Sequence, residues 1–239
     1  MEAPKIIADA LAAGFRPHLL FYSPQRIDAE QSRLVQRAER LGARVVPVSD
    51  EVLGLVTETV TPQGIVAIFP YPSREFRHPS RESVLFLVID RLQDPGNLGT
   101  LLRSALGSGT HAVFLLPGTV DPYNGKVVRA AAGAHFHLPI VEVADELPPW
   151  VRHADQFVVA DPRAAMTYDD VDWTRPSVLA IGSEAHGVSP AVRQLATHVV
   201  AIPLRGGVES LNAAVAGSII LFEAARQRRK ATGVTTILR

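Results

Sequence analysis

The feature that most constrains this chain is a set of five segments in which every position is apolar. A strand built from such a segment is hydrophobic on both faces, which suits a parallel sheet covered by helices on each side. The segments are residues 84–89, 112–116, 157–160, 178–181 and 199–202. Helical patterns separate or follow them at residues 98–106, 125–132, 190–195 and 211–230. We therefore predict an α/β fold with a central parallel sheet.

The first seventy residues show the same alternation on a smaller scale. Strands are expected at residues 18–22, 44–48 and 64–69, and helices at residues 3–13, at residues 28–41 and from about Ser49. Residues 70–83 contain three prolines and no periodic pattern, which is typical of a linker. We predict a small α/β domain at residues 1–70, a linker at 71–83 and a larger α/β domain at 84–239.

Net charge is a weak guide here, because Lys and Arg number 24 and Asp and Glu also number 24. Proteins that bind nucleic acids usually carry a basic excess. The tail differs, since after Glu223 it has no acid and carries Arg226, Arg228, Arg229, Lys230 and Arg239. Arginine suits phosphate binding because its planar guanidinium can donate to two oxygens at once. For any single arginine, a solvated helix face is the simpler interpretation.

Cysteine usage and apolar run length bound the class of protein. The chain has no cysteine, which excludes disulfides, thiol catalysis and cysteine-bound zinc. No apolar run approaches the roughly 20 residues that span a bilayer. The first residues also lack the layout of an export signal. We expect a cytoplasmic protein with no membrane partner.

Three strand ends in the larger domain open into polar, glycine-containing loops. In open α/β sheets ligands bind outside the carboxyl ends of the strands, so these loops are expected to form one pocket. The first loop, DRLQDPGNLG, begins after the strand at 84–89 and leads into a helix that carries Arg103. Pro95-Gly96 predicts a tight turn, and Asn97 is predicted as the N-cap of that helix. A capped helix with a surface arginine is the structural alternative.

The second and third loops have the same character. In GSEAHGVSP, Gly182 and Gly187 bracket a polar turn that contains Glu184, and glycines at a strand end allow a ligand close to the backbone. In IPLRGGVESLN, a Gly-Gly pair precedes Ser210 and Asn212 at the start of the last helix. The structural alternative is an ordinary strand-to-helix turn for the second loop and, for the third loop, an N-cap at Ser210.

Motifs of other enzyme classes are missing or misplaced. The sequence has no phosphate-binding loop of the G-x-x-x-x-G-K-[ST] type and no G-x-S-x-G elbow. Gly107-Ser108-Gly109 follows a helix and precedes a strand, which is the wrong order for a dinucleotide fingerprint. His135-x-His137 has no third candidate ligand, so we expect no metal site.

The three loops resemble the three motifs of the SpoU class of RNA ribose methyltransferases. The matching stretches are DRLQDPGNLGTLLRSA, VLAIGSEAHGVS and VAIPLRGGVESLNAAVAGSIILFEAARQR, with VVRAAAGAHFHLPI between them. TPQGIVAIF, at residues 61–69, resembles the closing strand of the ribosomal-protein-like RNA-binding domain that often precedes this catalytic domain. The resemblance implies a trefoil knot in the C-terminal domain, a homodimer and S-adenosylmethionine as cofactor.

The same resemblance implies the reaction and its residues. It predicts methyl transfer to a ribose 2′-hydroxyl of structured RNA, with 23S rRNA ahead of tRNA as substrate and DNA not expected. The catalytic residues would be Arg103, Asn97, Glu184, Ser210 and Asn212, and the cofactor-binding residues Gly182, Ile202 and Leu211. The sequence departs from the family where Ala213 and Ala214 follow Asn212, and at Ala131, where a serine is frequent. Each change to alanine at 131 and 214 removes a hydroxyl that the family often carries.

Two further functions stay open on the residues alone. One is an RNA-binding or ribosome-assembly factor that keeps the fold without turnover, for which Ala214 is the only support. The other is a nucleotide-dependent oxidoreductase, which would need the missing glycine fingerprint. Retention of the five polar residues named above favours the enzyme.

Overall fold

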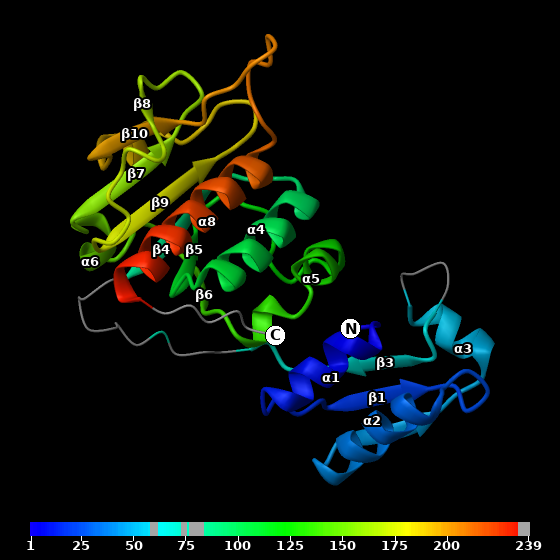
Figure 1. Cartoon of the computed structure of the whole chain (residues 1–239). Coiled ribbons are helices and arrows are strands. Elements are labelled where there is room, and N and C mark those ends of the chain that lie inside the picture. Colours follow the sequence, from blue (N-terminus) through cyan, green and yellow to red (C-terminus); the bar gives the residue numbers. More distant parts are fainter. Residues whose placement is uncertain (58–61, 73–75, 77–83, 234–239) are drawn as a thin grey trace. The chain divides into compact units, whose positions relative to one another are not determined.

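The computed structural model of the chain describes residues 1–57, 62–72, 76 and 84–233. Its contacts divide the chain into two units (Figure 1). The first consists of Met1–Ser73 together with Val128–His137, and the second of Arg74–Val127 together with Leu138–Arg239. The predicted division at residues 71–83 stays a prediction, because most of that segment lies outside the described residues.

The first unit is built on a three-stranded sheet of order β2-β1-β3. Strand β1 (Leu19–Tyr22) runs parallel to β2 (Arg44–Pro47) and antiparallel to β3 (Ile65–Ile68). The helices are α1 (Pro4–Ala12), α2 (Ala29–Arg40) and α3 (Asp50–Leu55). Asp28 caps α2 by accepting the backbone N–H of Gln31, and Ser49 caps α3 by accepting the backbone N–H of Val52. The core contains Ile7, Leu11, Leu20, Val35 and Ile65.

Residues 128–137 belong to the first unit although they lie far along the sequence. The turn η1 (Ala134–Phe136) places the ring of Phe136 at centroid distances of 5.0 Å from Phe15 and 5.5 Å from Phe69. His137 Nε2 lies 3.0 Å from Asp9 Oδ1, on α1. This segment therefore fills part of the hydrophobic core of the first unit.

The second unit contains a seven-stranded sheet of order β6-β5-β4-β9-β7-β10-β8, in which every pairing is parallel. This confirms the predicted α/β fold with a parallel sheet, and all five predicted strands are present. The strands are β4 (Leu85–Asp90), β5 (Ala112–Leu115), β6 (Ile140–Glu142), β7 (Gln156–Ala160), β8 (Met166–Thr167), β9 (Ser177–Gly182) and β10 (His198–Ala201). Strands β6 and β8 were not predicted, because they are short and not fully buried.

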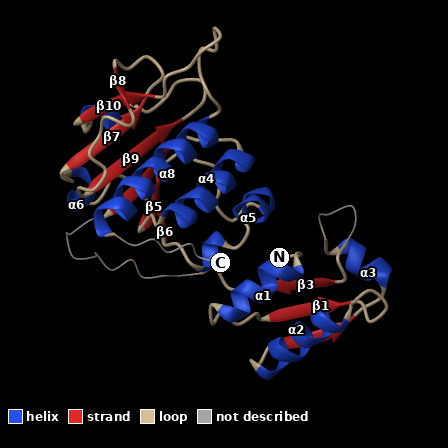
Figure 2. Cartoon of the chain, viewed as in Figure 1, coloured by secondary structure: helices blue, strands red, loops and turns tan. Residues whose placement is uncertain are grey.

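Helices cover both faces of this sheet. On one face α4 (Pro95–Ser108) and α8 (Ala213–Thr232) lie side by side (Figures 1 and 2). Their close approach depends on Gly217, because a Cβ there would lie 2.5 Å from Leu101 Cδ2. The other face packs against α6 (Pro149–Arg152) and α7 (Pro190–Gln194) through Val151 and Val192. Helix α5 (Gly125–Ala131) connects the two units along the chain.

Phe76 shows that part of the predicted linker packs firmly. Its ring stacks on Trp150 at 5.2 Å and lies edge-on to Phe86 and Phe114.

Within the described residues, no helix is both long and apolar enough to cross a membrane.

Arg228 fastens the end of α8 to the amino-terminal end of the sheet. Its guanidinium donates to the carbonyl oxygens of Trp173, Val84 and Arg175 at 2.7, 2.9 and 2.8 Å. Burial of the guanidinium lowers the pKa of Arg228 to about 10. This arginine of the basic tail is therefore bound within the protein.

Candidate functional site

The site lies where the two central strands end. Asp90, the last residue of β4, is paired with Gly182, the last residue of β9. The first and second loops therefore start beside one another at the carboxyl edge of the sheet. The third loop joins β10 to α8, which packs against α4. Because all of these strands are parallel, the three loops open on the same edge, as predicted.

Asp94, rather than Asn97, caps helix α4. The Asp94 carboxylate accepts the backbone N–H of Asn97 at 2.7 Å, and Pro95 occupies the first turn. The predicted N-cap role of Asn97 is wrong, because an acid three positions earlier precedes a proline that suits the helix start. The correction leaves the side chain of Asn97 available for other contacts.

A chain of hydrogen bonds joins the three loops through their polar side chains. Asn212 caps α8, because its Oδ1 accepts the N–H groups of Ala214 at 2.9 Å and Val215 at 3.2 Å. Its Nδ2 then donates to Asn97 Oδ1 at 2.9 Å. Asn97 Nδ2 in turn donates to Glu184 Oε1. The helix N–H groups thus fix the orientation of both amides in sequence.

The structure brings together Asn97, Glu184 and Asn212, which the sequence predicted from three separate motifs. Asn212, rather than Ser210, caps α8, so the structural alternative for Ser210 does not apply. Ser210 is exposed, and so is Arg103 on α4. Within the described part of the chain, neither side chain makes a hydrogen bond or an ion pair. They lie outside the hydrogen-bonded chain and can meet a ligand.

The second loop is a tight turn that presents Glu184. Ser183 and Gly187 exchange two backbone hydrogen bonds, of 3.0 and 2.9 Å, so the chain folds back on itself within five residues. Gly182 lies under this fold, and a Cβ there would be 2.0 Å from the carbonyl carbon of Gly187. The glycine is needed because the loop packs against its own backbone, which is a structural reason beyond ligand access.

Asp90 is a site residue that our sequence reasoning missed. Its side chain is 2% exposed, and Oδ2 accepts the backbone N–H of Ser189 at the end of the second loop. Arg91, the next residue, has a left-handed backbone with φ of 58°. A carboxylate directly after five buried apolar residues was the signal available in the sequence.

The residues predicted to hold S-adenosylmethionine fit such a group in chemical character. Ile202 and Leu211 are partly buried apolar residues on the third loop, and Gly182 offers backbone groups at a strand end. The third loop also has two exposed glycines, Gly206 and Gly207, in left-handed conformation. Ala131 and Ala214 are both buried, at 1% and 2% exposure, so the missing hydroxyls would have lain inside the protein.

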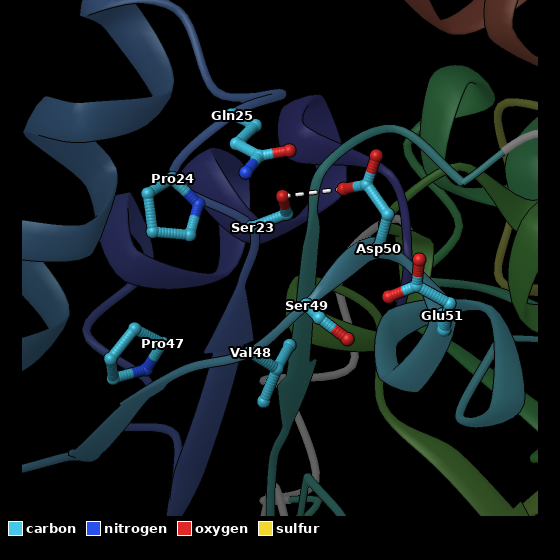
Figure 3. A pocket seen from close by; sticks show the side chains of 8 residues that line it. All are labelled: Ser23, Pro24, Gln25, Pro47, Val48, Ser49, Asp50 and Glu51. Atoms are coloured by element: carbon cyan, nitrogen blue, oxygen red, sulfur yellow. Dashed lines mark hydrogen bonds between the residues drawn. The ribbon is translucent and has the colours of Figure 1, made fainter.

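A pocket in the first unit was also not predicted. It lies at the carboxyl ends of β1 and β2 (Figure 3) and is lined by Ser23, Pro24, Gln25, Pro47, Val48, Ser49, Asp50 and Glu51. Ser23 Oγ donates to Asp50 Oδ1 at 2.6 Å, and Arg26 Nε lies 2.7 Å from Asp50 Oδ2. Hydrogen bonds from Ser23 and then Arg26 lower the pKa of Asp50. Its carboxylate is therefore engaged within the protein.

Comparisons with known proteins agree with this geometry. Residues 84–222 match the SpoU rRNA Methylase family, and residues 1–67 match the MRM3-like substrate binding domain. A Synechocystis protein described as an uncharacterized tRNA/rRNA methyltransferase is 41% identical over 80% of this chain and 72% of its own. The 23S rRNA (uridine(2479)-2′-O)-methyltransferase of Streptomyces viridochromogenes is 34% identical over 96% of this chain and 83% of its own.

A solved structure has the same architecture. The SpoU methyltransferase AviRb from Streptomyces viridochromogenes, in complex with the cofactor AdoMet, superposes with a TM-score of 0.84 at 34% identity. The match covers 95% of this chain and 89% of that chain. The likeness therefore extends over both units and all three loops.

Proposed function

We propose an activity from the premise that this chain belongs to the SpoU rRNA methylase family. It is an S-adenosylmethionine-dependent RNA methyltransferase that methylates a ribose 2′-hydroxyl, with 23S rRNA as its substrate. The observation that carries the proposal is the hydrogen-bonded chain Glu184–Asn97–Asn212, which joins the three loops at one edge of the sheet. The names of the relatives support RNA as the substrate class.

Cofactor binding is assigned to the second and third loops. Gly182 would offer its backbone, and Ile202 and Leu211 would contact the apolar parts of the cofactor. Bound S-adenosylmethionine supplies a methyl group on a positively charged sulfur. A pocket of neutral groups suits that chemistry, because it does not favour the charged ground state as water would.

Arg103 has the role of fixing the nucleophile. A ribose hydroxyl is a poor nucleophile until its proton leaves, and its oxygen must point at the methyl carbon. The exposed Arg103 guanidinium can grip the phosphate next to the target ribose and so fix the hydroxyl. A guanidinium stays protonated in proteins and is therefore a poor general base. The hydroxyl proton would instead be released to solvent water as the oxygen takes the methyl group.

The remaining polar residues hold the loops and the substrate. Asn97 and Asn212 lock the first and third loops together, and Glu184 anchors the second loop to Asn97. Ser210, exposed beside Asn212, is placed to donate to or accept from the RNA. Together these residues orient the substrate, and orientation supplies much of the rate where the chemistry is a single displacement.

The first unit has the role of holding the RNA. Its match to a substrate binding domain supports this assignment. The protein works in the cytoplasm as a homodimer, with residues 71–83 linking the two domains and a trefoil knot in the C-terminal one. The likeness to AviRb supports a shared chain path. Sedimentation and cell fractionation test the dimer and the location.

The test of the activity is a methyl-transfer assay with two RNA pools. Purified protein is incubated with labelled S-adenosylmethionine and either unmodified 23S rRNA or unmodified tRNA, and the digested nucleosides are identified by mass spectrometry. The expected result is one 2′-O-methyl nucleoside from 23S rRNA. A methylated base in place of a methylated ribose would refute the proposed reaction. Label in tRNA alone would refute the substrate.

A further inference from the structure

Asp90 is a buried carboxylate at the end of a strand. It ends the central strand β4 with a side-chain exposure of 2%. Within the described residues, no other carboxylate is buried to this extent. Removing a carboxylate from water is costly unless it is paired and hydrogen-bonded, so a buried acid needs a compensating contact. The contacts that Asp90 makes all concern the loops of the site.

Asp90 lies beside both ends of the second loop and binds one of them through its carboxylate. At the start of the loop, Asp90 is the strand partner of Gly182. At its end, Asp90 Oδ2 accepts the backbone N–H of Ser189, which caps α7. Between these points the Ser183–Gly187 turn is closed by its own backbone hydrogen bonds. Glu184 lies on this turn, so its position relative to Asn97 depends on the two fixed ends.

The residue after Asp90 is also constrained. Arg91 has a left-handed φ of 58°, which side chains with a Cβ rarely adopt, and its N–H donates to Thr119 Oγ1 at 3.1 Å. Its Nε lies 3.4 Å from Asp90 Oδ1. Backbone strain of this kind persists where surrounding contacts enforce it, and it gathers at functional sites.

We infer that Asp90 is a positioning residue for methyl transfer: its carboxylate anchors the backbone of Ser189 and thereby holds Glu184 against Asn97. The inference rests on the proposed function in that Glu184 and Asn97 are taken as parts of the site. Asp90 acts through them. It does not touch the substrate.

The test compares two pairs of variants that differ in one hydrogen-bonding group. Ser189→Pro removes the N–H that Asp90 accepts, and the Ser189 φ of −62° suits proline. Ser189→Ala keeps the N–H and removes only the capping hydroxyl. Asp90→Ala removes the acceptor, whereas Asp90→Asn keeps an acceptor oxygen. Asp161→Ala is the matched control, since this partly buried carboxylate binds Arg193 on the same helix α7.

The readout is the side-chain amide resonance of Asn97 by ¹H–¹⁵N NMR, together with the single-turnover rate on RNA. Glu184→Gln marks where that resonance lies once the charged contact is lost. We expect Ser189→Pro and Asp90→Ala to move the Asn97 resonance to that position and to slow transfer between about ten- and a hundredfold. Ser189→Ala, Asp90→Asn and Asp161→Ala should stay near the wild type.

The result that overturns the inference is a Ser189→Pro protein whose Asn97 resonance and rate match those of Ser189→Ala. An Asp90→Asn protein that behaves like Asp90→Ala would also overturn it. If the wild type transfers no methyl group to any RNA, the proposed function fails. The Asn97 resonance still decides the anchoring role in that case, because its measurement needs neither cofactor nor RNA.

Discussion

Arg103 combines exposure with a lack of partners inside the protein, and both matter for its role. Within the described residues it makes no hydrogen bond or ion pair, so its guanidinium has all its donors available. By contrast, the guanidinium of Arg228 donates hydrogen bonds to three backbone carbonyls. Of two arginines that look alike in the sequence, Arg228 therefore serves the fold, whereas Arg103 is proposed to bind a ligand.

Substitution of Arg103 should slow catalysis without affecting stability. We expect Arg103→Ala to lower kcat about a hundredfold or more, because a positioned charge that acts in the transition state is lost. Arg103→Lys should recover only part of the rate, since a point charge cannot grip two oxygens. Single-turnover assays and thermal unfolding measure the two effects. Arg229→Ala, an exposed arginine in the last turn of α8, is the control. An unchanged rate for Arg103→Ala would remove this residue from the mechanism.

Gly182 should tolerate no side chain. We expect Gly182→Ala to cost about 2 kcal/mol or more of folding stability, because the new Cβ would collide with the backbone of Gly187. Cofactor affinity should fall with it. Denaturant unfolding and calorimetric titration check both. Gly54→Ala is the comparison, since a Cβ at Gly54 in α3 meets nothing within 4 Å. Equal stability of the two variants would contradict the tight turn.

At the scale of elements, the sequence predicted the strands of the second sheet. It failed at a helix cap, where two neighbouring residues could each take the capping position. The five strands were found because their residues are apolar, and in four of them, β4, β5, β7 and β9, both faces are buried. The cap of α4 was misassigned because Asp94 and Asn97 lie three positions apart, and only the helix geometry selects between them. Asn97, Glu184 and Asn212 were identified by motif. Their contact depends on strand order, which no local pattern contains.

The amino-terminal edge of the second sheet should be sensitive to acid. His111 Nδ1 accepts the N–H of Leu85 at 3.2 Å, and burial, followed by the charge of Arg228, lowers the pKa of His111. The unfolded chain therefore binds a proton more readily than the native protein. Stability is fully present above the ordinary histidine pKa, about 6.5, and falls as pH decreases below it.

The measurement is the unfolding free energy by urea denaturation between pH 7.5 and pH 5, in the wild type and in His111→Gln. We expect a smaller loss on acidification in the variant, because its side chain does not titrate. A wild-type stability that rises as pH falls through this range would reverse the sign and refute the argument.

At the scale of the whole molecule, the chain passes from the first unit to the second, returns to the first for one short segment and then re-enters the second. Residues 128–137 leave the catalytic stretch, contribute Phe136 to the core of the first unit and return. No sequence pattern predicted this, because the segment has the composition of an ordinary helix and turn. Its partners in the first unit lie more than 60 positions away along the chain.

Removal of the first unit should therefore damage what remains. We expect a fragment of residues 84–239 to aggregate and bind a hydrophobic dye, because Phe136 would lose the rings of Phe15 and Phe69. Phe136→Ser in the same fragment should reduce dye binding. In the full chain, Phe136→Ala should cost about 3 kcal/mol or more. Size-exclusion chromatography and thermal unfolding report these effects, and a monodisperse fragment that binds no dye would argue against them.

The packing of Phe136 in the core of the first unit also affects how such a protein can evolve. A substrate-binding domain attached by a linker alone can be exchanged for another by recombination at that linker. Here an exchange of residues 1–70 would leave Phe136 facing a surface that did not evolve with it. Lineages that acquire a new RNA target are therefore expected to change the surface of the first unit by substitution, while its contacts with residues 128–137 and the catalytic half descend together.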